Sequence, residues 1–310
     1  MGIVGAGYIA REHLNVIQAL KGVNVSGITA RTISKAQELA DQYGIARVYE
    51  DTNNLIKNCT LDAVLVLVSA DQIFPVVKEL IPNQIPLFIE KPPGLFPEQT
   101  KILASLAAKH GTNNMVGYNR RYFSIFQKGL DIVSNNGSLL GLAVEGHERF
   151  WKITEMDISD EMRGNWIFAN STHTIDLLRL FGGEIDQINT MKKSVKEKNG
   201  DQFIASLEFN SGSLGTYTSH WFSPGGWSVK LYGHGVTVEF KPLEEGIWID
   251  TDFQQHDILP DEVDLKFKPG FYRQMEAFIN LIKKSKLDWP GMDLAEALKT
   301  MELAENFVHA

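Results

Sequence analysis

The chain has 310 residues, a length that accommodates about two domains. Hydrophobic residues make up 44% of the chain and charged residues 22%, which is typical of a soluble globular protein. The net charge is −8 at pH 7, and the one lysine-rich stretch, Lys192–Lys198, is short enough to be a solvated loop. Neither nucleic acid nor a membrane is therefore an expected partner.

The single cysteine, Cys59, excludes an internal disulfide and a cysteine-based metal site. No apolar run approaches the roughly 20 residues that a membrane-spanning helix needs. The first residues form an apolar strand and not a signal peptide, so we expect a cytoplasmic protein. Because this strand starts almost at Met1, we expect the natural chain to begin a few residues earlier.

The first predicted elements are a short strand, Gly2–Val4, a glycine-rich turn, and a helix from about Tyr8 to Leu20. The turn, GAGYIA at residues 5–10, has the pattern G-x-G-x-x-A of a dinucleotide-binding fold. The free N–H groups and the dipole of a helix that starts there favour a bound phosphate. The alternative is an ordinary strand-to-helix turn.

Each small residue of the turn has a separate role in this interpretation. Gly5 allows the tight turn, and Gly7 lets the backbone approach a pyrophosphate that a side chain would block. Ala10 is small enough for the helix to pack closely on the strand.

Strands and helices then alternate up to about residue 118, which predicts a doubly wound parallel sheet. This Rossmann domain is expected over residues 1–118. Its further strands are expected at Val23–Ile28, Val48–Tyr49, Ala63–Val68, Leu87–Ile89 and Met115–Gly117, with helical spacing over 36–43, 73–81 and 103–110.

The pattern changes after Tyr118 to a helix over 122–136 followed by successive strands. The residues 119–310 are therefore expected to form an α+β domain for substrate binding and oligomerisation, with a large, mostly antiparallel open sheet. Its open face favours a homodimer or homotetramer, with a solvated face as the alternative. The strands are expected at Leu140–Phe150, Phe203–Phe209, Leu214–Trp221, Trp227–Tyr232 and Val236–Phe240, and closing helices, able to pack back on the first domain, at 271–284 and 293–308.

The end of the second strand favours NADP over NAD as the cofactor. Ala30 occupies the position where an acidic residue would bind the ribose 2′-hydroxyl. Arg31, Thr32 and Ser34 follow, and a guanidinium with hydroxyls would hold a 2′-phosphate. The alternative is a solvated Arg31 with NAD bound.

A second informative stretch, Phe88–Pro93, closes the fifth strand, where such sheets meet their ligands. Lys91 follows Glu90 and precedes two prolines, which restrain the backbone around it. A lysine held there could bind a substrate hydroxyl and stabilise a developing alkoxide, whereas standing alone it would be a surface lysine.

These motifs, with Gly117–Tyr122 and a later His173–Asp176, follow the order found in Gfo/Idh/MocA oxidoreductases, which the chain resembles over essentially its whole length. The resemblance implies a Rossmann domain, an open-sheet second domain, a nicotinamide cofactor and hydride transfer at a carbon that bears a hydroxyl. It also implies a sugar, cyclitol or nucleotide-sugar substrate, with Lys91 as the catalytic lysine and His173 as the active-site histidine.

The spacing around His173 can be interpreted without the resemblance. Ala169, His173, Asp176 and Leu180 are expected to share one helix face. A histidine suits a proton acceptor for an alcohol that loses hydride, and Asp176 could orient its ring. The alternative is a buried histidine satisfied by a backbone group.

The chain departs from the family at Ala169, where many members carry an aspartate that completes a Lys–Asp–His set. The neighbouring Asn170 points about 100° away in a regular helix. Either Asp176, Glu90 or a substrate group replaces the acid, or the proton relay differs.

Three sets of site residues follow from these arguments. The catalytic set is Lys91, His173 and Asp176. The cofactor-binding set is Gly5, Gly7, Tyr8, Ile9, Ala10, Arg31, Thr32, Ser34, Val68, Glu90, Lys91 and Asn119. The substrate-binding set is Lys91, Arg120, Tyr122, Trp151, Arg163, Asn165, Trp166, Asn170 and His173.

Within the substrate set, an arginine could meet a diphosphate or carboxylate, and Trp151 and Trp166 could stack on a sugar or belong to the core. We expect no metal site, because the other histidines lack companions at ligand spacing and are interpreted as structural or surface residues. These are His13, His110, His147, His220, His234, His256 and His309.

The predicted function is NAD(P)-dependent hydride transfer at a secondary alcohol of a sugar, cyclitol or nucleotide-sugar. Two alternatives are a cofactor-retaining glycoside hydrolase or lyase, and a non-catalytic regulator that senses NADP.

Overall fold

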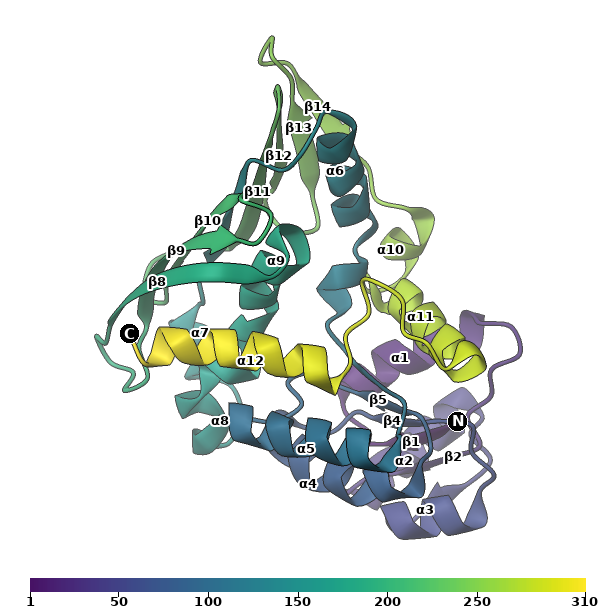
Figure 1. The fold of residues 1–310 in the computed structure, drawn as a ribbon. Coiled ribbons are helices and arrows are strands. Elements are labelled where there is room, and N and C mark those ends of the chain that lie inside the picture. The colour runs from purple at the N-terminus through teal and green to yellow at the C-terminus, as the bar shows by residue number, and fades with distance from the viewer. The chain divides into compact units, whose positions relative to one another are not determined.

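The computed structural model describes residues 1–310, which divide into two compact units (Figure 1). The first unit contains residues 1–119 and 266–298, and the second contains residues 120–265 and 299–310. The segment 266–298, expected from the sequence in the second domain, therefore belongs to the first unit. Its helix α11 (Phe271–Lys284) packs against α1 (Tyr8–Ala19).

The first unit is built on a six-stranded parallel sheet of order β3-β2-β1-β4-β5-β6. Its central strands β1, β4 and β5 are wholly buried, as expected for strands covered on both faces. The strands are β1 (Gly2–Val4), β2 (Gly27–Thr29), β3 (Val48–Tyr49), β4 (Val64–Val66), β5 (Leu87–Ile89) and β6 (Asn114–Val116).

Helices between consecutive strands of this sheet give the predicted doubly wound Rossmann arrangement, and α11 is added from a later part of the chain. Local signals set several of their ends: Asp51 caps α3 through the amide of Asn54, and Gly44 ends α2 in the left-handed conformation. Besides α1 and α11 they are α2 (Ile33–Tyr43), α3 (Thr52–Asn58), α4 (Ala70–Leu80), the 3₁₀ turn η1 (Ile81–Asn83) and α5 (Pro97–His110).

The second unit contains an eight-stranded sheet of order β14-β13-β12-β11-β7-β10-β9-β8. All neighbouring strands are antiparallel except β7 and β10, which confirms the predicted mostly antiparallel sheet. The strands are β7 (Gly141–Gly146), β8 (Ile185–Lys193), β9 (Gln202–Phe209), β10 (Leu214–His220), β11 (Trp227–Gly233), β12 (Val236–Phe240), β13 (Gly246–Ile249) and β14 (Gln255–Ile258).

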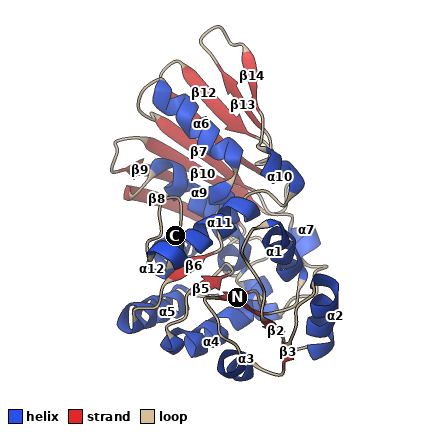
Figure 2. Ribbon diagram, turned by 90° about the vertical axis from the view of Figure 1, so that its right-hand side faces the viewer, coloured by secondary structure: helices blue, strands red, loops and turns tan.

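Helices α6 (Ser124–Asn135) and α9 (Thr172–Gly182) cover one face of this sheet, and every residue of α9 is buried (Figure 2). Along β9 the residues alternate between buried and exposed, so the opposite face is open. The remaining elements are η2 (Asn119–Tyr122), α7 (Phe150–Ile153), α8 (Asp160–Gly164), the π-helical turn η3 (Ile167–Ser171), α10 (Glu262–Lys266) and α12 (Leu294–Val308), the last of which is shared between the units.

Three sequence-based boundaries were wrong. The strand expected at Leu140–Phe150 ends at Gly146, and Phe150 begins α7 instead. The strand expected from Val23 begins only at Gly27. Lys192 and Lys193, interpreted as part of a loop, end the edge strand β8, where charged side chains oppose further strand pairing.

Candidate functional site

The turn after β1 has the geometry that dinucleotide binding requires. Gly5 has a φ of +117°, and a Cβ atom placed on it would lie 2.3 Å from the carbonyl oxygen of Leu67, so only glycine fits. A Cβ atom on Gly7 would meet nothing within 4 Å, which leaves open space beside the start of α1. No side chain caps this helix, so its first N–H groups can bind a phosphate that enters this space.

The cofactor-binding residues expected from the sequence follow β1, β2, β4, β5 and β6 directly. Because these strands are parallel, their carboxyl ends meet at one edge of the sheet. Arg31, Thr32 and Ser34 are exposed at this edge. Ala10 is fully buried, as its packing role requires.

The loop that carries Lys91 is fixed by a buried polar pair. Glu90 lies 3.0 Å from Nε2 of His13 through one carboxylate oxygen, and its other oxygen accepts the backbone N–H of Lys91 at 3.1 Å. The His13 ring is inaccessible to solvent and packs between Phe88 and Phe271. Glu90 is therefore committed to holding this loop, which argues against its replacing the acid absent at Ala169.

Lys268 is a residue of this edge that the sequence did not reveal. Its ammonium group lies 5.1 Å from the ring centre of Tyr8, the first residue of α1, and 5.1 Å from that of Phe271. It places a positive charge beside the end of α1 that follows the glycine turn. Lys268 is distant in sequence from that turn, so no local pattern could have linked the two.

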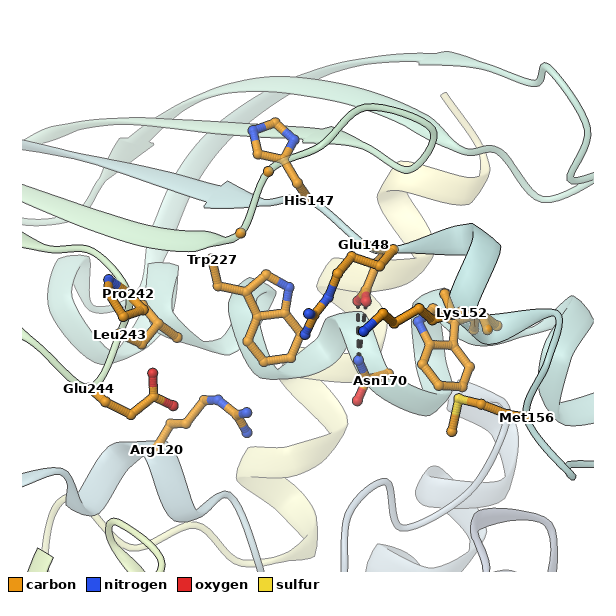
Figure 3. Close-up of a pocket in the computed structure, with 15 residues that line it drawn as sticks. Arg120, His147, Glu148, Lys152, Met156, Asn170, Trp227, Pro242, Leu243 and Glu244 are labelled. Atoms are coloured by element: carbon orange, nitrogen blue, oxygen red, sulfur yellow. Dashed lines mark hydrogen bonds between the residues drawn. The ribbon is translucent and has the colours of Figure 1, made fainter. Parts of the chain in front are cut away.

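The second unit contains a cavity of 710 Å³, within the size range of small-molecule sites (Figure 3). It is bounded by the segment after β7, by α7, by η3 and by the loops before β11 and after β12. The lining residues are Arg120, His147, Glu148, Arg149, Lys152, Ile153, Met156, Trp166, Asn170, Gly225, Gly226, Trp227, Pro242, Leu243 and Glu244.

Glu148 and Asn170 form a polar pair in the cavity wall (Figure 3). Nδ2 of Asn170 lies 3.2 and 3.3 Å from the two carboxylate oxygens of Glu148, and the hydroxyl of Ser171 donates to Glu148 at 2.8 Å. Glu148 is only 5% exposed. A carboxylate held by neighbouring donors in a cavity is a suitable acceptor for substrate hydroxyls.

The expectation that Ala169 and His173 share one face of a regular helix was wrong, because Ile167–Ser171 is a π-helical turn. Such a turn contains an extra residue and changes the direction of the side chains before α9. Asn170 lines the cavity, whereas Ala169 is buried and does not.

Aromatic rings form a second feature of the cavity. The guanidinium carbon of Arg120 lies 4.5 Å from the ring centre of Trp227, and the His173 ring centre lies 5.9 Å from that of Trp227. Trp166 is buried, and its indole N–H has no acceptor. The cavity thus offers flat apolar surfaces and a hydrogen-bond donor, and His173 packs against one of its lining residues.

Several residues expected to bind substrate lie outside this cavity. The Trp151 side chain is 41% exposed on α7, and Arg163 bonds to Asp160 and to the Met156 carbonyl. Asn165 bonds to Glu161 and Asn199. Tyr122 is buried, and burial raises the pKa of its hydroxyl.

The Asp176 carboxylate is held by Arg121 and Thr300, and the orienting role toward His173 that its spacing suggested stays a prediction. The carboxylate accepts bonds from Nε and Nη2 of Arg121 at 2.7 and 2.8 Å and from the Thr300 hydroxyl at 2.9 Å. Arg121 and Asp176 are both buried. This pair joins η2, α9 and α12 within the second unit.

The sequence missed most of the cavity, including Glu148, Lys152 and Trp227. His147, interpreted as structural or surface, lines it as well and accepts the His220 backbone N–H at Nδ1, 3.0 Å away. Burial lowers the pKa of the His147 imidazole. No group of three or more His, Cys, Asp or Glu side chains could hold a metal ion, and no helix could cross a bilayer.

Comparisons with known proteins identify the class that this fold defines. The model of an oxidoreductase family with an NAD-binding Rossmann fold matches residues 1–118, and that of the GFO/IDH/MocA C-terminal domain matches residues 143–239. The chain belongs to the Gfo/Idh/MocA family, an oxidoreductase family with an NAD-binding Rossmann fold.

Among its relatives is scyllo-inositol 2-dehydrogenase (NAD(+)) of Bacillus subtilis (strain 168), 22% identical over 303 residues that cover 92% of this chain and 86% of that protein. The oxidoreductase YrbE of the same organism is 27% identical over 226 residues, 69% of this chain and 64% of that protein. A similar solved structure is an oxidoreductase from Agrobacterium radiobacter in complex with NAD+, L-tartaric acid and magnesium, with a TM-score of 0.80, 16% identity, and coverage of 98% of this chain and 93% of that one.

Proposed function

We propose that the protein is a nicotinamide-dependent dehydrogenase or reductase that acts on a secondary alcohol of a sugar, cyclitol or nucleotide-sugar. The observation that carries the cofactor part is the glycine turn, where Gly5 admits no side chain and open space adjoins Gly7 at the start of α1. The inositol dehydrogenase among the relatives supports a polyol substrate.

In the proposed reaction the bound nicotinamide supplies hydride acceptance or donation. Lys91 donates a hydrogen bond to the substrate hydroxyl and stabilises negative charge that develops on its oxygen. His173 takes the hydroxyl proton during oxidation and returns it during reduction. Asp176 is assigned an indirect role: its carboxylate, bound by Arg121 and Thr300, fixes helix α9, on which His173 lies.

For the cofactor we propose NADP in preference to NAD. Ala30 removes the acidic side chain that would repel a 2′-phosphate, and Arg31, Thr32 and Ser34 are exposed beside it. The Bacillus subtilis relative is named as an NAD(+) enzyme and does not support a preference for NADP. The preference for NADP therefore rests on Ala30, Arg31, Thr32 and Ser34 of this chain. The cytoplasmic location and the homo-oligomer stay predictions.

The first experiment strips the protein of nucleotide and titrates it with NADPH and with NADH. A panel of cyclitols, sugars and nucleotide-sugars is then followed at the nicotinamide absorbance. We expect turnover of at least one secondary alcohol. Release of a leaving group without net change in absorbance would instead indicate the hydrolase or lyase alternative, and tight coenzyme binding without turnover the regulator.

Lys91→Ala and His173→Ala test the catalytic assignment. Each is expected to lower kcat by about 10²- to 10⁴-fold, the usual range for loss of an acid–base or charge-stabilising group. Lys101→Gln, on the exposed side of α5, is the control and should keep wild-type turnover. Full turnover in a Lys91→Ala, His173→Ala double variant would exclude the proposed mechanism.

A further inference from the structure

Carboxylates of both units are candidates to replace the acid absent at Ala169. Glu90 is bound to His13, and Asp176 is bound to Arg121 and Thr300. Two carboxylates line the cavity of the second unit, Glu148 and Glu244. Glu244 is exposed, whereas Glu148 is buried and its position is fixed by hydrogen bonds.

We propose that Glu148, together with Asn170, binds hydroxyl groups of a polyol ring and supplies the carboxylate that Ala169 lacks. The proposal rests on the proposed function, since it names the group that recognises the substrate class of that reaction. It assigns to Glu148 direct contact with the substrate.

The donors that hold Glu148 come from the segment before the His173 helix. Asn170 and Ser171 both belong to the π-helical turn that directly precedes α9, the helix of His173. The side chain of Glu148 is thereby connected to the segment in which the family acid is replaced by alanine. π-helical turns are frequent at functional sites. A substrate site at this turn accounts both for its irregular geometry and for the position of Glu148 beside it.

The groups that line the cavity are chemically complementary to a polyol ring. Each hydroxyl of a polyol is a donor that an ionised carboxylate accepts strongly, and the planar amide of Asn170 beside it can both donate and accept. Trp166 and Trp227 line the same cavity and provide flat apolar surfaces for the C–H faces of a ring. A carboxylate, an amide and two indoles suit a polyhydroxylated ring better than a hydrocarbon.

Positively charged side chains also line the cavity around Glu148. They are Arg120, Arg149 and Lys152, and the Lys152 side chain extends toward the Glu148–Asn170 pair (Figure 3). Arg149 and Lys152 are both exposed, so a substrate that enters the cavity can reach their charged groups. These positive groups complement the negative charge of a carboxylate, and a carboxylate only accepts hydrogen bonds.

The test compares Glu148→Gln with Glu155→Gln, an exposed residue that does not line the cavity. Both variants remove one negative charge, and glutamine preserves the shape and one oxygen of Glu148. Binding of myo-inositol to the NADPH-loaded protein is measured through tryptophan fluorescence, with cyclohexanol as the probe that offers only one hydroxyl. Thermal unfolding and NADPH affinity are measured in parallel.

We expect Glu148→Gln to weaken myo-inositol binding by about 10- to 100-fold, the range for loss of a hydrogen bond to a charged group. Its effect on cyclohexanol and NADPH should stay within about 2-fold, and Glu155→Gln should behave as wild type. Glu148→Asp, which keeps the charge, should recover part of the affinity. Unchanged myo-inositol affinity in Glu148→Gln would overturn the proposal.

The outcomes separate this proposal from the proposed function. Myo-inositol binding that Glu148→Gln loses, in a protein that turns over no alcohol, would support the assignment of Glu148 and contradict the dehydrogenase. Turnover with an unchanged KM in Glu148→Gln would contradict the assignment and leave the dehydrogenase standing. Binding of cyclohexanol but of no polyol would contradict the assignment as well.

Discussion

The two units present their candidate site groups by different means. In the first unit, the site is made of backbone turns at the carboxyl edge of a parallel sheet, and its geometry depends on Gly5 and on the loop that contains Lys91. In the second unit, the cavity is made of side chains from separate segments around one sheet. The first kind of site is specified by a few adjacent residues, and the second only by the tertiary fold.

This contrast explains why polar pairs have different roles in the two units. The pair of His13 and Glu90 supports a loop whose direction the strand and the prolines already restrict. The pair of Arg121 and Asp176 joins three elements that share no local sequence. The stability of the second unit should therefore depend more strongly on the Arg121–Asp176 pair than the stability of the first unit depends on the His13–Glu90 pair.

The largest expected effect comes from breaking that pair. Asp176→Asn removes the carboxylate from a buried ion pair with the Arg121 guanidinium, so the free energy of unfolding should fall by about 3–5 kcal/mol. Denaturant unfolding followed by tryptophan fluorescence measures the change. Lys230→Met, which removes the half-exposed pair with Glu239, is the control and should cost no more than about 1 kcal/mol. Equal losses in both variants would show that the buried Arg121–Asp176 pair contributes no more to stability than the half-exposed pair.

A smaller effect is expected at the coenzyme edge of the first unit. Arg31→Ala should weaken NADPH binding by about 10- to 100-fold, because one charge-assisted contact to the 2′-phosphate is lost, and should leave NADH binding within about 2-fold. Fluorescence titration with the two coenzymes measures both values. Arg47→Ala removes another exposed arginine of the same unit and should change neither. Equal weakening of NADH and NADPH by Arg31→Ala would exclude recognition of the 2′-phosphate.

The smallest effect concerns the pH dependence of the second unit. Burial lowers the pKa of His147, and its Nδ1 accepts a backbone N–H bond that only the unprotonated nitrogen can accept. The unfolded chain therefore binds this proton first as the pH falls. The contribution of His147 to stability is complete above the unfolded pKa of about 6.5 and is lost as the pH falls toward the lower folded value.

His147→Asn should accordingly reduce the loss of stability between pH 7 and pH 5. The change should stay below about 1 kcal/mol, because the ring is only half-buried and water screens its charge. Thermal unfolding at both pH values measures it, with His234→Asn as the exposed control. A stability loss that His147→Asn leaves unchanged would assign the acid sensitivity to other groups.

Much of the fold could be predicted from the spacing of apolar residues and from the glycines and prolines that end helices and strands. Strand β5 (Leu87–Ile89) and helix α11 (Phe271–Lys284) lie at the residues expected, because apolar runs and helical spacing are clear there. Strand β8 was missed because its apolar residues Ile185, Ile188 and Met191 are three apart. A register shift between Ile185 and Gln187 also breaks the alternation of a regular strand.

More of the candidate site residues could be predicted from the sequence in the first unit than in the second. The turn around Gly5 and Gly7 could be inferred because its backbone geometry restricts the residue types that fit. Glu148 carries no such signal, since nothing near it in sequence indicates that Asn170 will lie beside it. The π-helical turn that brings them together also invalidated the helical-spacing argument, which assumed a regular helix.

The order of the second sheet also limits how copies of the chain could assemble. Its last strand, β8, ends in Lys192 and Lys193, and the Lys192 ammonium group donates to the Val308 carbonyl. A strand from another molecule that paired with β8 would meet the charged side chains of Lys192 and Lys193. Lys192 is already bound to the end of α12. Continuous extension of the sheet from molecule to molecule is thereby disfavoured at this edge. The predicted homodimer or homotetramer would instead use the open face of the sheet.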